Sequence, residues 1–219
     1  MKNIQQVRTF EKIVNKTLEK QENKKLIHFK KGETLVKQGV IVNHVMFVKN
    51  GIVKLEYETE NGTVLLDIVS GQNMICLSGL FGDNIAKYSV IALTDTDIFD
   101  IRRESLEDFI KTDPVFASMI VQSLNYNNHH LYERISSLNK KQMPGRLADV
   151  MLYLADEVYG KDAFPMHLSR QDLGNFSGMA MMSVIRTLQS LKEDGVLEEE
   201  AREIIILKRN KLKQISENG

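Results

Sequence analysis

The sequence predicts an α+β protein in which a β-rich N-terminal half is followed by a long helix and a mainly helical C-terminal half. Short β-branched and aromatic runs separated by turn residues fill residues 26–101. A stripe of apolar residues with heptad spacing follows within residues 114–138. Two short helical patterns then flank a glycine within residues 168–197. We therefore divide the chain into residues 1–113, 114–140 and 141–219.

Elements of the N-terminal part are read from periodicity and turn residues. Apolar residues spaced three and four apart over residues 4–22 predict a small accessory helix. Evenly spaced strands and turns over residues 26–101 then predict a small barrel or sandwich. Asn50-Gly51 and Asn61-Gly62 each lie between β-type runs and predict two hairpins.

The pattern becomes helical after Arg103. Ser105 is a candidate N-cap for a short helix, and Pro114 suits the first turn of the next one. That second helix carries apolar residues four and three apart, with one polar member, Asn128. The stripe consists of Ala117, Val121, Leu124, Asn128, Leu131, Ile135 and Leu138. It is narrow enough to predict pairing with a second copy of the chain, with an ordinary core helix as the alternative.

A break at residues 143–145, Met-Pro-Gly, predicts a hinge before the C-terminal part. There, Ser169 is placed to cap a short helix through Phe176, and Gly178 supplies a turn before a second helix at residues 180–194. Their shared apolar interface consists of Leu173, Phe176, Val184, Leu188 and Leu191. The exposed leading end of the second helix is predicted to consist of Met179, Ala180, Met181, Met182 and Ser183. Two short strands after Gly195 suit a wing.

The segment SRQDLGNFSGMAMMSVIRTLQSLKEDGVL resembles the C-terminal signature of the Crp/Fnr family. The matching residues are Ser169, Arg170, Gln171, Asp172, Gly178, Val184, Arg186, Leu188 and Gly195. The stretches FKKGETLVKQG, VMFVKNGIVKL and SGQNMICLSGLFGD are similar to the family's N-terminal domain in order and spacing. The resemblance covers residues 24–208. It implies a double-stranded β-helix (β-roll) like that of cyclic-nucleotide-binding domains, a long dimerisation helix and a winged helix-turn-helix.

This resemblance implies a homodimeric transcription regulator that binds a pseudo-palindromic operator, with RNA polymerase and a small-molecule effector as further partners. Ser169, Arg170 and Gln171 are then expected to lie against phosphates, and Arg186 to face the groove. Many relatives carry an Arg-Glu pair where this chain has Met181-Met182. Methionine cannot make the hydrogen bonds of that pair, so the operator is expected to differ, with thymine methyl contacts or DNA shape as substitutes.

The resemblance also implies an effector pocket. Its candidate residues are Gly71, Cys76, Leu77, Ser78, Gly79, Lys87, Tyr88 and Ser89, with Leu131 and Tyr132 from the long helix. Leu77 stands where cyclic-nucleotide binders have a glutamate, and no arginine occurs between Gly71 and Ile101, although Lys87 offers a weaker charge. We therefore expect no response to cyclic AMP or cyclic GMP, and the effector is unidentified.

Two alternatives remain open, one for the effector and one for what the C-terminal domain binds. Some relatives are haem-based sensors, and His28, His44, His129, His130 and His167 are candidate ligands, although no spacing singles out a haem site. No metal site is therefore predicted, and the cofactor is unknown. The alternative to DNA binding is a regulatory module that binds protein through a winged helix that no longer reads DNA. The balance of 29 basic and 29 acidic residues and the pair Met181-Met182 point toward it.

Composition excludes several classes of protein. The single cysteine, Cys76, excludes an internal disulfide and a multi-cysteine cluster in one chain, and is expected to be a buried hydrophobe. No apolar run reaches the roughly 18 residues of a membrane helix, and the chain start lacks a secretion signal, so a cytoplasmic protein is expected. No catalytic motif of recognisable spacing occurs, so an enzyme is not predicted.

With balanced charge, a DNA surface requires local clusters of cations, such as Lys208, Arg209, Lys211 and Lys213.

Overall fold

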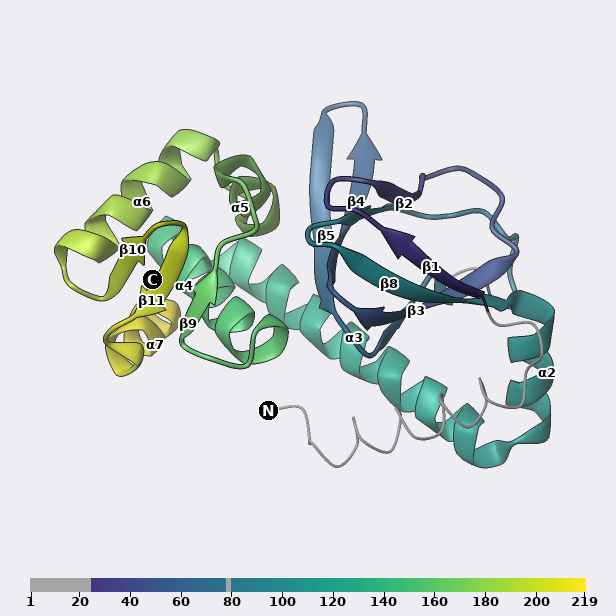
Figure 1. Ribbon diagram of the computed structural model, residues 1–219. Coiled ribbons are helices and arrows are strands. Elements are labelled where there is room, and N and C mark those ends of the chain that lie inside the picture. Colours follow the sequence, from purple (N-terminus) through teal and green to yellow (C-terminus); the bar gives the residue numbers. More distant parts are fainter. Residues whose placement is uncertain (1–24, 78–79) are drawn as a thin grey trace. The chain divides into compact units, whose positions relative to one another are not determined.

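The computed structural model describes residues 25–77 and 80–219, so the helix predicted over residues 4–22 lies outside the described residues. Contacts divide the chain into two compact units, residues 1–127 and 128–219. The long helix α3 continues through this division (Figure 1). The predicted helix over residues 114–138 is confirmed, because α3 spans Pro114–Lys140 and starts at the expected proline.

The described residues of the N-terminal unit form strands, one short helix and the first part of α3. The elements before α3 are β1 (Lys25–Phe29), β2 (Thr34–Val36), β3 (His44–Asn50), β4 (Ile52–Thr59), β5 (Gly62–Ser70), β6 (Asn73–Ile75), β7 (Ser89–Ala92), β8 (Thr96–Arg102) and α2 (Arg103–Thr112). Ser105 is not the N-cap of α2, because the helix begins at Arg103 and its N-cap residue, Arg102, makes no side-chain cap.

The strands form two four-stranded antiparallel sheets, with the orders β1-β8-β3-β6 and β2-β7-β4-β5. Successive strands alternate between these sheets except for β4 and β5, which are neighbours in one sheet. This alternation is the double-stranded β-helix that the resemblance implies. It brings strands distant in the sequence together, as in the pairing of Val48 with Ile98.

The core of this unit lies between the two sheets, because each sheet contributes one apolar face to it. Its buried side chains are Val36, Met46, Val48, Val53, Leu55, Ile75, Cys76, Val90 and Ile98. A second cluster covers the outer face of the sheet that contains β3 and β8. There, Leu106 from α2 and Phe116 and Ile120 from α3 pack against Phe47 and Ile101. α2 and the first turns of α3 therefore cover the outer face of this sheet.

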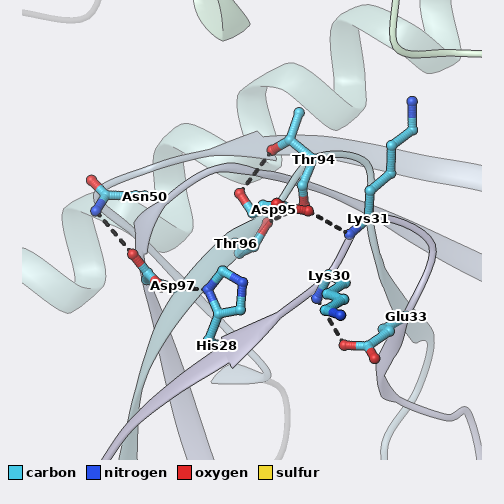
Figure 2. Close-up of polar contacts among 9 residues, drawn as sticks. All are labelled: His28, Lys30, Lys31, Glu33, Asn50, Thr94, Asp95, Thr96 and Asp97. Carbon is cyan, nitrogen blue, oxygen red and sulfur yellow. Dashed lines mark hydrogen bonds and ion pairs between the residues drawn. The ribbon is translucent and has the colours of Figure 1, made fainter.

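The hairpin predicted at Asn50-Gly51 is wrong. Here the chain passes from one sheet to the other, because β3 pairs with β6 and β8 whereas β4 pairs with β5 and β7. Gly51 has a φ of 94°, and a Cβ on it would lie 2.4 Å from Thr96 Oγ1. Figure 2 shows the polar contacts beside this corner, where His28 Nδ1 and Asn50 Nδ2 lie 2.9 and 3.3 Å from the two carboxylate oxygens of Asp97. A dipeptide typical of a hairpin thus makes a crossing between sheets.

The hairpin predicted at Asn61-Gly62 is confirmed, with a turn one residue earlier than expected. Thr59 pairs with Gly62, so Glu60 and Asn61 form the two-residue turn between β4 and β5. Thr59 Oγ1 donates to the Gly62 carbonyl oxygen over 2.8 Å and fixes this turn.

The C-terminal unit contains the rest of α3 and the helix-turn-helix. Its other elements are α4 (Met143–Tyr153), the π-helix η2 (Leu154–Val158), β9 (Ala163–Pro165), α5 (Arg170–Ser177), α6 (Met181–Glu193), β10 (Leu197–Glu200), β11 (Glu203–Ile206) and α7 (Arg209–Asn218). The predicted wing is confirmed as β10 and β11, and β9 joins it to give the sheet order β10-β11-β9. β9 and α7 were not predicted from the sequence, and α7 packs against α4.

Candidate functional site

The helix-turn-helix begins with a reciprocal cap on α5. The Asp172 backbone N–H donates to Ser169 Oγ over 3.0 Å, and the Ser169 N–H donates to Asp172 Oδ2 over 2.9 Å. This capping box satisfies two backbone donors at the helix start and confirms the predicted N-cap. Gln171 is exposed, and its side chain bonds to Asn175.

Two glycines shape the connection between α5 and α6, Gly178 in the turn and Gly174 within α5. Gly178 ends α5 in the left-handed region, with φ 63° and ψ 38°. A Cβ on Gly174 would lie 2.6 Å from the Met179 carbonyl oxygen, so only glycine permits this close approach. Arg146 Nη1 donates to the Gly178 carbonyl oxygen over 2.9 Å. The local sequence showed Gly178, whereas the need for Gly174 depends on the packing of the two helices.

α6 has one buried face and one exposed face. The predicted interface is confirmed, because Leu173, Phe176, Val184, Leu188 and Leu191 are all buried. We call the exposed residues of the first turns the reading face of α6: Ala180, Met181, Met182, Ile185 and Arg186. The predicted exposure of Met179 is wrong. Its side chain is 7% exposed, because Met179 still belongs to the turn and packs inward before α6 starts at Met181.

The positive charge of Arg170 is neutralised within the unit. Its guanidinium forms an ion pair with Glu199 on the wing strand β10, and Lys192 Nζ lies 3.3 Å from the same carboxylate. Burial raises the pKa of the Glu199 carboxyl, but the hydrogen bonds and charges of Arg170 and Lys192 outweigh that effect and hold the pKa below its ordinary value. Glu199 is therefore ionised at neutral pH. The Glu199 carboxylate thus occupies the guanidinium of Arg170, which was expected to bind phosphate.

Other cations of this unit also have internal partners. Arg209 forms ion pairs with Asp156 and Asp162, and Lys208 Nζ donates to the Asp194 carbonyl oxygen over 3.2 Å. Two members of the basic cluster predicted near the C-terminus, Lys208 and Arg209, thus already make contacts within the unit. Lys211 and Lys213 of that cluster are exposed on α7.

Within the described residues, no hydrogen bond or ion pair involves the side chains of Arg186 on α6 and Arg202 at the wing tip. Ala201 and Arg202 form the turn of the wing, with φ values of 45° and 71°. Arg202 is exposed, and it was not among the residues predicted to bind DNA. Both arginines can approach an external phosphate without breaking an internal pair.

Three residues of the predicted effector pocket line a small cavity in this structure. Cys76, Lys87 and Tyr88 line a cavity of about 10 Å³, together with residues 42 and 84–86. That volume holds about one water molecule, whereas ligand pockets span roughly 300–1,000 Å³. The Cys76 N–H donates to the Tyr88 hydroxyl over 3.1 Å. Burial raises the pKa of the Cys76 thiol to about 12, so the thiol stays neutral and unreactive, as expected of a buried hydrophobe.

Other candidate pocket residues have structural contacts. Lys87 pairs with Asp83 at 2.5 Å, and buried Ser89 accepts from the Gln38 N–H over 2.9 Å. Leu77 packs partly against the cluster around Phe47. A Cβ on Gly71 would lie 3.0 Å from the Lys49 carbonyl oxygen, so close backbone packing accounts for this glycine. Ser78 and Gly79 lie outside the described residues.

Two domain models match separate parts of this chain. A cyclic nucleotide-binding domain matches residues 26–113, and a Crp-like helix-turn-helix domain matches residues 145–215. The transcriptional activator protein FnrA of Stutzerimonas stutzeri is 26% identical over 185 residues, which cover 81% of this chain and 75% of FnrA. The chain belongs to the Crp/Fnr family of transcription regulators. This family assigns DNA binding to the helix-turn-helix of the C-terminal unit.

Further relatives agree with the assignment to the Crp/Fnr family. The cAMP-activated global transcriptional regulator CRP of Salmonella typhimurium is 21% identical over 79% of this chain and 85% of its own length. The solved structure of FixK2 from Bradyrhizobium japonicum shares the fold, with a TM-score of 0.80, 20% identity and coverage of 88% of this chain and 97% of FixK2. The family is one of regulators and not of enzymes.

The stripe predicted on α3 of this Crp/Fnr regulator lies on an open face of the single chain. Its large apolar members are all exposed, with Val121 56%, Leu131 46% and Ile135 48% accessible. Leu124, Asn128 and Leu138 are exposed as well, and Ala117 is half-buried. Tyr132 lies beside the stripe and is 65% exposed. An ordinary core helix does not leave such a row of apolar side chains in water.

The described residues contain no group of three His, Cys, Asp or Glu side chains arranged to bind a metal ion. His28 and His44 pair with Asp97 and Asp100, while His129 and His130 lie near Glu133. Across residues 25–77 and 80–219, no helix combines the length and apolar character that crossing a membrane requires.

Proposed function

We propose that this Crp/Fnr regulator acts as a homodimer that binds a pseudo-palindromic operator and responds to an effector other than a cyclic nucleotide. Two copies pair along the α3 stripe, with Asn128 fixing their register. The two α6 helices then enter successive major grooves about 34–36 Å apart. The exposure of the heptad-spaced apolar residues on α3 carries this proposal, because pairing is what removes such a stripe from water.

Dimerisation is tested by placing a charge in the stripe. Leu131→Asp puts an unpaired carboxylate into the paired surface, which costs about 3–5 kcal/mol and weakens association by at least ~100-fold. Val115→Asp is the matched control, since Val115 is an exposed apolar residue of α3 outside the stripe. Analytical ultracentrifugation over a concentration series measures both. A wild-type chain that sediments as a monomer at micromolar concentration contradicts the proposal.

DNA binding is tested by mobility shift across salt concentrations. Phosphate contacts release counterions, so the affinity of a DNA-binding dimer falls steeply as salt rises. A chain that binds no duplex in dilute buffer, and instead retains a protein partner, would support the alternative of a winged helix that does not read DNA. We propose RNA polymerase as a further partner of the operator-bound dimer.

The effector is proposed to differ from cyclic AMP and cyclic GMP on three observations. Leu77 replaces the expected glutamate, Lys87 is already paired with Asp83, and the cavity that Lys87 lines with Cys76 and Tyr88 holds only about 10 Å³. The roles of Leu131 and Tyr132 as pocket residues belong to the same proposal.

A further inference from the structure

We infer that this regulator selects its operator mainly through the 5-methyl groups of thymines, which contact the apolar side chains of the α6 reading face. The inference rests on the proposed function, because it requires α6 to lie in the major groove. It goes beyond that function by naming the chemical feature of DNA that determines specificity, and by assigning its recognition to Met181, Met182 and Ile185.

The first observation is the exposure of these side chains. Met181, Met182 and Ile185 are 42%, 53% and 39% exposed, whereas Val184 on the same turn is fully buried. Single exposed apolar residues are common on protein surfaces. Three of them within five positions of one helix form an apolar surface, which marks an interaction site when it lies on a binding element.

The second observation is the scarcity of hydrogen-bonding groups on the same turns. A thioether is only a weak acceptor, and the side chains of alanine and isoleucine have no hydrogen-bonding atoms. Ser183 is half-buried, so Arg186 is the one exposed polar side chain among residues 180–186. A helix that reads guanine or cytosine needs donors or acceptors at these positions. The reading face of α6 supplies one cation and otherwise apolar surface.

In the major groove, only the T side of an A·T pair presents an apolar group, the thymine methyl. The composition of the reading face therefore complements thymines better than it complements G·C pairs. Met182 and Arg186 are four residues apart and neighbours on the helix surface. The arginine can bind a phosphate or a guanine beside the methyl contacts. The flexible methionines can adapt to methyl groups at more than one position.

The test starts from a duplex library with randomised half-sites, enriched on the full-length dimer. Each thymidine of the enriched half-site is then replaced in turn by deoxyuridine, which removes the methyl group and keeps the base pair. Losing one buried methyl weakens binding about four-fold, and symmetric replacement in both half-sites about sixteen-fold. Fluorescence anisotropy at one fixed salt concentration measures Kd for each duplex.

Variants then connect the methyl groups to named side chains. In Met182→Gln and in Met181→Ala, the penalty for deoxyuridine should fall toward one-fold at the position that each methionine contacts. Met143→Gln is the matched control, because Met143 is equally exposed at 44% but lies at the start of α4. It should retain the full penalty. Thermal unfolding midpoints close to wild type show that the variants are folded.

The outcomes separate the inference from the proposed function. Failure to enrich any sequence overturns the proposed function and the inference with it. An enriched operator that binds equally well with deoxyuridine at every position overturns the inference alone. A deoxyuridine penalty that persists in both methionine variants also overturns it, because the methyl groups are then read by other residues.

Discussion

In the C-terminal unit, the reading face of α6 leaves Met181, Met182 and Arg186 exposed to an external partner. In the N-terminal unit, the residues of the predicted pocket contact one another instead, as when the Tyr88 hydroxyl accepts from the Cys76 N–H. The two regions therefore differ in whether their candidate site residues face solvent or contact other residues of the same unit. The reading face of α6 is open to solvent, whereas the cavity lined by Cys76, Lys87 and Tyr88 holds only about 10 Å³.

The largest expected effect is on the stability of the sensor fold. In Gly51→Ala, the new Cβ meets Thr96 Oγ1 at 2.4 Å and the backbone has a φ of 94°. Strain and overpacking together should lower the free energy of unfolding by about 3 kcal/mol or more. Gly32→Ala is the control for strain alone, since Gly32 also has positive φ but open space. Hydrogen exchange should show lost protection within residues 25–127, and equal losses in both variants would contradict the steric account.

A smaller loss of stability is expected at the turn of the helix-turn-helix. Gly178→Ala places a Cβ 2.8 Å from Leu138 Cδ2, a flexible side-chain end that can move, so the cost is about 1–2 kcal/mol, mostly from the left-handed backbone. Gly160→Ala has a similar φ of 66° with open space. Urea unfolding of both compares the crowded turn with the open one. A variant at Gly178 that is as stable as wild type would argue against a tightly specified turn.

Arg186→Ala should weaken operator binding about ten-fold and reduce the slope of log affinity against log salt by about one per subunit if the contact is to phosphate. The reason is that Arg186 has no ion pair within the described residues and stands on the reading face. Lys161→Ala removes one exposed cation outside the helix-turn-helix and serves as the control. Unchanged affinity at moderate salt would remove Arg186 from the site.

Glu199→Gln should strengthen DNA binding by about three-fold, because Arg170 then loses its internal partner and can bind phosphate. Glu198→Gln removes the same charge from the next residue of β10, which is exposed, and isolates the effect of net charge. Equal gains in both variants would contradict a role for the Arg170 pair.

Because the pKa of Glu199 is lowered, the pair stabilises the fold above the ordinary carboxyl pKa of 4.5 and loses this effect only as pH falls below it. Neutral buffers therefore leave the comparison unchanged.

The smallest expected effect is that of cyclic AMP. A ligand at 100 times its Kd adds about 2.7 kcal/mol to the stability of the state that binds it. Millimolar cyclic AMP should leave the unfolding midpoint and the operator affinity unchanged, because Leu77 and the paired Lys87 offer no ribose or phosphate site. A rise of several degrees in the midpoint would show that the cavity opens for a nucleotide.

The sequence by itself determined those features that depend on neighbours a few residues apart. The heptad spacing predicted α3, and Ser169 as an N-cap with Gly178 as a turn predicted the helix-turn-helix. Hydrogen bonds in helices and tight turns join residues three to five positions apart, so short patterns contain the necessary information.

Only the tertiary structure decided features that join distant residues. The crossing at Gly51 depends on Thr96, which arrives from β8 through long-range strand pairing. Arg170 meets Glu199 across 29 residues, and the Tyr88 hydroxyl accepts from the Cys76 N–H. These contacts form only when the strands and helices pack, so no local pattern distinguishes a cation free to bind phosphate from one neutralised by its own wing. The same packing buries Met179 while leaving its neighbours Met181 and Met182 exposed.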